Sequence, residues 1–125
     1  MTNEGTYDFY DSQLKRIVDV NSSGAVSLGF SPSFTSADCT GTTYAANAVN
    51  NLTLYKGATT TAGQYAYYVV VNSNVKSTQQ TIHSQISGHT CVTDGADGLP
   101  ETLDTWQMTP VSINFTDPIA MPIHF

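Results

Sequence analysis

Short alternations of apolar and polar residues recur along this chain and indicate β-strands. After the turn sequence NSSG, Val26, Leu28 and Phe30 alternate with Ser27 and Gly29. The last seven residues carry their apolar side chains on one side, at Ile119, Met121, Ile123 and Phe125. A period of two places such side chains on one face of a strand. Strong helix formers are scarce, so the pattern predicts an all-β protein.

The expected strands are short, and turn residues such as Asn, Asp, Ser and Gly separate most of them. Their ranges are 6–10, 14–20, 25–30, 42–46, 51–56, 65–72, 78–87, 106–115 and 119–125. Many short strands at this spacing are typical of a β-sandwich or a small barrel. A chain of 125 residues is long enough for one core, so we expect residues 1–125 to form a single antiparallel β-domain.

Three local features refine this expectation. The run YAYYVVV, residues 65–71, loses its alternation in its second half, which predicts a central strand buried on both faces. Lys56 and Gly57 are expected to form a turn. Pro118 and Pro122 lack the N–H that a strand donates, so the last strand should lie at an edge or contain a bulge.

The composition predicts a polar surface with few charges. Charged residues make up 11% of the chain, against about 25% in average soluble domains, and this is typical of secreted, cell-surface and virion proteins. The net charge is −6, and Lys and Arg total 4. Nucleic-acid binding and docking on anionic membranes need clustered cations, so neither is expected. The longest apolar run, residues 65–71, is too short for membrane insertion as a helix.

The two cysteines, Cys39 and Cys91, are far apart in the sequence. A zinc site needs about four Cys or His ligands, usually with a closely spaced pair, and a catalytic cysteine needs a group that stabilises its thiolate. The chain has no closely spaced cysteine pair, although His83, His89 and His124 are available. Both cysteines adjoin turns, and closing a loop of this length removes roughly 4 kcal/mol of unfolded-state entropy. We therefore expect a Cys39–Cys91 disulfide, with two buried free thiols as the alternative.

The stretch DCTGTTY, residues 38–44, resembles a motif of the form D-C-[ST]-G-x-x-Y in uncharacterised bacterial extracellular β-domains. In those domains a second cysteine follows in a polar segment, as Cys91 does in SGHTC. They often end in a Phe- and Pro-rich apolar stretch, which FTDPIAMPIHF resembles. The resemblance implies a compact β-domain with one disulfide, presented at a cell surface or on a larger assembly, and it implies no particular activity.

The densest acidic region lies between residues 93 and 105. Its carboxylates are Asp94, Asp97, Glu101 and Asp104. The stretch DGLPE is similar to part of the bacterial calcium repeat D-x-D-G-D-G-L-P-D, but Thr93 and Gly95 stand where the repeat has carboxylates. A solvated acidic loop is therefore the favoured interpretation, and a calcium site at these four residues is the alternative. No cofactor is expected.

No arrangement of residues predicts an enzyme. The chain has no G-x-S-x-G motif and no glycine-rich phosphate loop. Asp8, Asp11 and Asp19 lie in early strands or turns, and their spacing singles out no pair for glycoside hydrolysis.

We therefore expect a non-enzymatic structural or adhesive module, a subunit or appendage domain of a bacterial surface structure or filament, located extracellularly or at the cell surface. Terminal segments with exposed alternating apolar residues can add to the sheet of a partner protein. The expected contacts are Tyr7, Phe9, Tyr10, Ile119, Met121, Ile123 and Phe125. One alternative is a virion protein, such as a phage decoration or tail component, which the absence of a signal sequence after Met1 favours. The other is a carbohydrate-binding module, in which exposed Tyr or Trp would stack on a glycan.

Overall fold

The computed structural model describes residues 7–46, 52–70, 77–96 and 98–119, and within these ranges the protein is all-β, as the sequence predicts. It has no helix there, and about 52% of these residues lie in strands. Accordingly, no helix in the described ranges is long and apolar enough to cross a membrane. The strands are β1 (Tyr7–Asp11), β2 (Arg16–Val20), β3 (Gly29–Phe30), β4 (Ser33–Phe34), β5 (Thr43–Ala45), β6 (Tyr55–Ala58), β7 (Tyr65–Val70), β8 (Thr78–Ile82), β9 (Ser84–Ser87), β10 (Thr90–Thr93) and β11 (Glu101–Val111).

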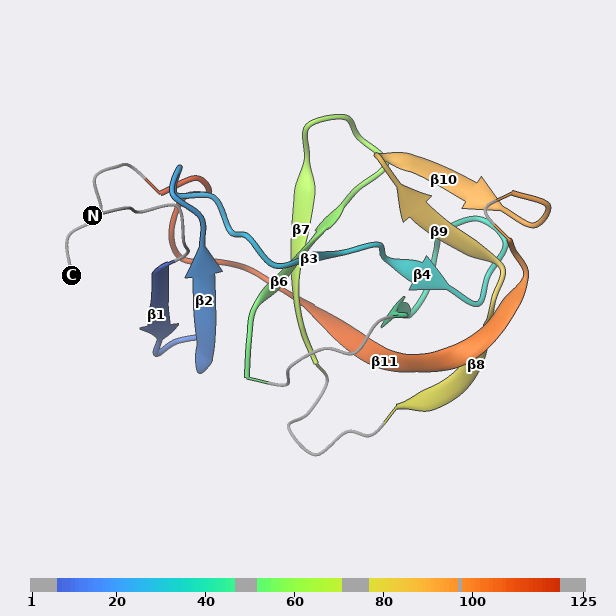
Figure 1. Cartoon of the computed structure of the whole chain (residues 1–125), viewed down its shortest axis with the longest axis horizontal. Coiled ribbons are helices and arrows are strands. Elements are labelled where there is room, and N and C mark those ends of the chain that lie inside the picture. The colour runs from blue at the N-terminus through green and yellow to red at the C-terminus, as the bar shows by residue number, and fades with distance from the viewer. Residues whose placement is uncertain (1–6, 47–51, 71–76, 97, 120–125) are drawn as a thin grey trace.

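The strands form two sheets of unequal size (Figure 1). β1 and β2 make an antiparallel hairpin at one end of the long axis. The other strands form a 9-stranded sheet in the order β10-β9-β4-β5-β11-β7-β6-β3, with β8 also paired to β11. This sheet is antiparallel except at β3 and β6, which are parallel, and it curls into a half-barrel. Of the two architectures that the sequence predicts, the curled sheet is closer to the barrel.

The long strand β11 organises the larger sheet. Its first half pairs with β8, and its second half pairs with β5 and β7. The predicted strand 78–87 is interrupted only at His83, whose N–H donates to the carbonyl of Phe34 at 3.0 Å. β8 pairs with β11 whereas β9 pairs with β4, so the chain changes its partner strand at His83.

β7 separates two hydrophobic clusters. Successive side chains of a strand point to opposite faces, so Val69 packs in one cluster while Tyr68 and Val70 pack in the other. None of the three is more than 8% exposed, which confirms the predicted central strand for its second half. The first cluster contains Val18, Val20, Val26, Leu54 and Val69, and the second contains Ala45, Tyr55, Tyr68, Val70 and Met108.

The turn predicted at Lys56 and Gly57 is wrong, because both residues lie inside β6. Pro32 packs so closely on this strand that a Cβ at Gly57 would lie 2.7 Å from the Pro32 Cγ. Glycine occurs in strands where another segment approaches the backbone closely. Gly57 therefore makes room for Pro32.

Other strand boundaries also differ from the prediction. β4, β10 and the first five residues of β11 lie in segments that the sequence pattern leaves as loops. The strand predicted at 106–115 ends at Val111, and of the strand predicted at 119–125 only Ile119 lies among the described residues. Glu101 and Asp104 at the start of β11 have weak strand propensity, but β8 supplies this segment with a complete ladder of partners, and pairing outweighs propensity.

After β11 the chain leaves the sheet and covers the turn that follows β2. The N–H of Ile119 donates to the carbonyl of Gly24 at 2.8 Å, and the Ile119 side chain packs against the first cluster. Gly24 has a φ of +88°, and a Cβ there would lie 2.2 Å from the Ile119 carbonyl oxygen. Glycine alone accommodates both the left-handed backbone and this close approach.

Replacing Gly24 with alanine should destabilise the fold more than replacing Gly63 with alanine. Both glycines are left-handed, with φ of +88° and +78°, but no atom lies within 4 Å of a Cβ built at Gly63. Placing alanine in a left-handed backbone conformation costs about 1–2 kcal/mol in both variants. The difference between their free energies of unfolding therefore measures the clash with Ile119. Urea denaturation of the two variants measures it, and equal losses of stability would contradict the close packing of the C-terminal segment.

Candidate functional site

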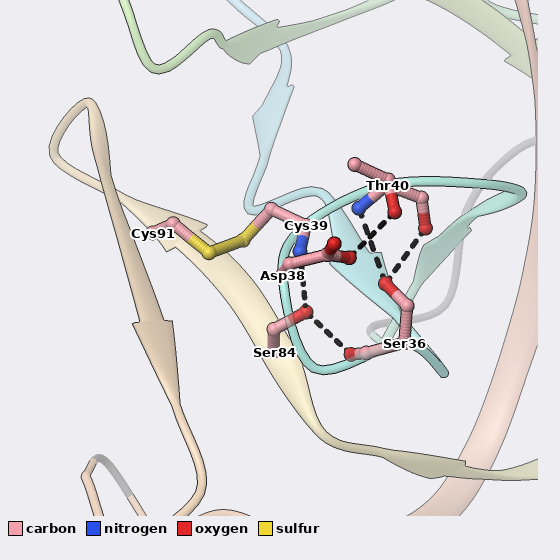
Figure 2. Close-up of a disulfide and its surroundings, with 6 residues drawn as sticks. All are labelled: Ser36, Asp38, Cys39, Thr40, Ser84 and Cys91. Carbon is pink, nitrogen blue, oxygen red and sulfur yellow. Dashed lines mark hydrogen bonds between the residues drawn. A yellow bond between two sulfur atoms is a disulfide. The ribbon is translucent and has the colours of Figure 1, made fainter.

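The disulfide predicted from the sequence joins Cys39, in the loop after β4, to Cys91 in β10 (Figure 2). The sulfurs lie 2.08 Å apart and the two Cα atoms 6.1 Å apart. Because each sulfur is bonded to the other, neither is available as a thiolate nucleophile or as a metal ligand. The prediction of a structural cross-link is confirmed, and the alternative of two free thiols is wrong.

A buried serine positions the cysteine loop. The hydroxyl of Ser84 in β9 accepts the N–H of Cys39 at 2.9 Å and donates to the carbonyl of Ser36 at 2.7 Å. Cys39 has a φ of 59°, a left-handed conformation that residues other than glycine rarely adopt. Beside it, hydrogen bonds from the hydroxyls of Thr40 and Ser36 hold the pKa of the Asp38 carboxyl below its ordinary value. Figure 2 shows these polar groups beside Cys39, on one side of the cross-link.

Ser84→Ala should lower the free energy of unfolding by about 1–3 kcal/mol, because the N–H of Cys39 and the carbonyl of Ser36 lose their buried partner. Ser87→Ala on the same strand is the control, since Ser87 is exposed. Denaturation of both variants with the disulfide intact measures the two effects. A Ser84→Ala protein as stable as the Ser87→Ala protein would contradict this role of the hydroxyl.

The buried carboxylate of Asp117 anchors the C-terminal segment to three other elements. Its side chain is 4% exposed. It accepts the N–H of Val26 at 2.9 Å, the ammonium of Lys56 at 3.1 Å and the hydroxyl of Tyr67. Burial by itself would raise the pKa of Asp117, but these three donors outweigh burial and hold the pKa below its ordinary value. Burial and the hydrogen bond to Asp117 raise the pKa of Tyr67 well above its usual range.

Asp117→Asn should lower the free energy of unfolding by about 1–3 kcal/mol at neutral pH, since it removes the charge that faces Lys56. The pKa of Asp117 is depressed in the folded protein, so its contribution is present above the unfolded value, near 3.8, and is lost as the pH falls through the folded value. The difference between the wild type and the variant should therefore shrink on acidification. Denaturation at several pH values measures this, with the exposed Asp104→Asn as the control. A difference that does not change with pH would contradict it.

The outward face of the β1–β2 hairpin joins an apolar pair to an acidic pair. Residues directly opposite each other in an antiparallel sheet share a face, and the register pairs Tyr10 with Ile17 and Asp8 with Asp19. Tyr10 is 63% exposed and Ile17 is 37% exposed. We call these four residues the hairpin face, and it is the candidate functional site.

The two carboxylates of the hairpin face interact with each other. A hydrogen bond with Asp19 raises the pKa of Asp8, and burial and the charge of Asp19 act in the same direction. Ser27 donates its hydroxyl to Asp19. The ion pairs found among the described residues lie elsewhere, at Lys56 and His83, so no described cation neutralises this acidic pair.

The register that creates the acidic pair is set by the hairpin turn. The carboxylate of Asp11 accepts the N–H groups of Gln13 and Leu14 at 2.9 and 3.0 Å. Lys15 has a left-handed backbone conformation, and β2 begins at the next residue. The pairing of Asp8 with Asp19 was not predicted from the sequence. The signal for it is present, because the two acids are equally distant from the two ends of this turn.

The structure distributes the predicted partner contacts over two faces. Tyr7, Phe9 and Ile119 pack against the first hydrophobic cluster, whereas Tyr10 points outward. The other predicted contacts, Met121, Ile123 and Phe125, lie outside the described residues. Contact with a partner stays a prediction for all of them.

The predicted calcium ligands do not converge among the described residues. Both carboxylate oxygens of Asp94 lie within 3.0 Å of Nδ1 of His83. Glu101 and Asp104 are three positions apart on β11, so they point to opposite faces of the sheet. Asp97 lies outside the described residues, and these contain no group of 3 or more His, Cys, Asp or Glu side chains that could hold a metal ion.

No protein-family model, curated protein or solved structure matches this chain.

Proposed function

We propose that this chain is a non-enzymatic structural or adhesive module, a subunit or appendage domain of a bacterial surface structure or filament. The observation that carries the proposal is the hairpin face, on which Tyr10 is 63% exposed beside Ile17. Tyrosine contributes strongly to protein interfaces, because its large ring buries apolar area and its hydroxyl can still form a hydrogen bond. In the assembly, a partner protein covers this face.

Two internal cross-links support a mechanical role. The disulfide ties the loop after β4 to β10, and Asp117 ties the C-terminal segment to β6 and β7. A domain constrained in this way presents its binding face in one conformation. Association then costs less conformational entropy than it would for a flexible segment.

The disulfide and the sequence resemblance support an extracellular or cell-surface location. Disulfides form and persist in oxidising environments and are rare in the cytosol. The resemblance of residues 38–44 to bacterial extracellular β-domains points the same way. A virion particle is the alternative site of assembly, since it also exposes its proteins to an oxidising medium.

The exposed ring of Tyr65 gives little support to a carbohydrate-binding module. Such a module stacks sugars on the free faces of Tyr or Trp rings. Tyr65 is 45% exposed, but the ammonium of Lys56 lies 4.6 Å from its ring centroid and the ring of His89 packs against it at 5.1 Å. This ring is therefore engaged within the protein.

Immunolabelling of the source cells, together with quantitative mass spectrometry of their purified surface structures and phage particles, tests the proposal. We expect the chain to be a stoichiometric component of a surface assembly. A stoichiometric place in phage particles would select the virion alternative instead. Recovery of the chain only as a free cytosolic monomer would contradict both.

Tyr10→Ser should reduce incorporation of the chain into its assembly by about 10- to 100-fold, the effect expected for loss of an interface tyrosine. Tyr65→Ser is the control, because it also removes a partly exposed tyrosine but lies outside the hairpin face. Quantitative immunoblots of the isolated assembly measure both. Equal incorporation of the two variants would show that the hairpin face does not contact the partner.

A further inference from the structure

At the outer edge of β1, no described strand pairs with the two residues of the hairpin face that β1 contributes. The N–H of Ile17 donates to the carbonyl of Leu52, and its carbonyl accepts from Leu54, so both groups point away from β1. The carbonyl of Asp19 likewise accepts from Ser27. In an antiparallel ladder, residues opposite each other either exchange both hydrogen bonds or none.

It follows that the residues opposite Ile17 and Asp19, namely Tyr10 and Asp8, direct their own backbone groups away from β2. Within the described ranges β2 is the only strand that pairs with β1. An additional strand could therefore form hydrogen bonds with Asp8 and Tyr10 and extend the hairpin to three strands.

The charges of the hairpin face select the partner. Asp8 and Asp19 lie directly opposite each other, and none of the ion pairs among the described residues includes them. Lys56 is already bound to Asp117, and the guanidinium of Arg16 donates to carbonyls of the hairpin turn. A cation from outside the chain would find an uncompensated acidic pair here.

A second copy of the chain is a poor occupant of this edge. Pairing of β1 with β1 of another copy would bring two such acidic pairs to neighbouring positions, and like charges across a sheet repel. The chain has a net charge of −6, so it offers few cations for relief.

We propose that the β1 edge binds an extended segment of a partner protein that carries a Lys or Arg and, two residues away, a large apolar side chain. The cation lies against Asp8 and extends toward Asp19 behind it, and the apolar group lies against Tyr10, whose neighbour on β2 is Ile17. The two positions are about 7 Å apart along a strand, which is the separation of alternate residues. This inference rests on the proposed function and specifies the chemistry of its partner.

Titration of the isotope-labelled protein with two heptapeptides tests the inference. One is acetylated and amidated Thr-Leu-Thr-Lys-Thr-Leu-Thr, and the other has Glu in place of Lys. We expect the Lys peptide to bind at least about tenfold more tightly at low salt and to shift the amide resonances of Asp8 and Tyr10. Added salt should weaken it, because the charges are exposed. Equal binding of the two peptides, or shifts confined to other strands, would overturn the proposal.

Asp8→Asn should remove most of the preference for the Lys peptide, whereas Asp104→Asn, an acid on β11, should leave it unchanged. Asp8 is exposed, and neutralising it relieves repulsion from Asp19, so we expect the variant to fold with wild-type stability or slightly more. A preference that survives Asp8→Asn in the folded protein would overturn the cation contact. If neither peptide binds while Tyr10→Ser still impairs incorporation, this inference fails and the proposed function stands. If incorporation does not depend on Tyr10, the proposed use of the hairpin face fails, whatever the peptides do.

Discussion

The buried carboxylate of Asp117 is the interaction on which the described structure most depends. A carboxylate that leaves water loses its hydration, so it is stable inside a protein only where donors replace the water. Here the donors come from three separate segments, at Val26, Lys56 and Tyr67. The same carboxylate thereby holds in place the C-terminal segment, which supplies the first cluster with Ile113, Phe115 and Ile119.

The two ends of the molecule are held by different chemistry. The β1–β2 hairpin lies at one end of the long axis and β10 lies toward the other (Figure 1). The ionic and hydrogen-bonded network of Asp117 holds the C-terminal segment, and the covalent bond between Cys39 and Cys91 holds β10. Between them, β7 contributes to both hydrophobic clusters and β11 pairs with three other strands. Among the described residues, the two networks and the strands between them therefore connect the hairpin end to the disulfide end.

In the N-terminal segment, the sequence predicts a strand, and packing decides which of its faces is buried. Alternation in TYDFY predicts a strand with two faces, but aromatic residues occur on both, so the pattern does not identify the buried one. Packing against Val18 and Val20 selects the face of Tyr7 and Phe9, and leaves Tyr10 with Asp8 in solvent. The acidic pair forms only when the turn sets the register, so it follows from the place of the turn together with the spacing of the two acids.

The all-β class, the approximate positions of most strands and the disulfide were all predictable from the sequence alone. Alternation and strand propensity act through neighbouring residues, and the partner of Cys39 was predictable because Cys91 is the other of the chain's 2 cysteines. The tertiary structure decided the curl of the sheet, the strand interruption at His83, the place of Gly57 inside β6 and the joining of Asp117 to its donors. Each of these depends on contacts between residues distant in sequence, and no local pattern specifies which distant residue will be the partner.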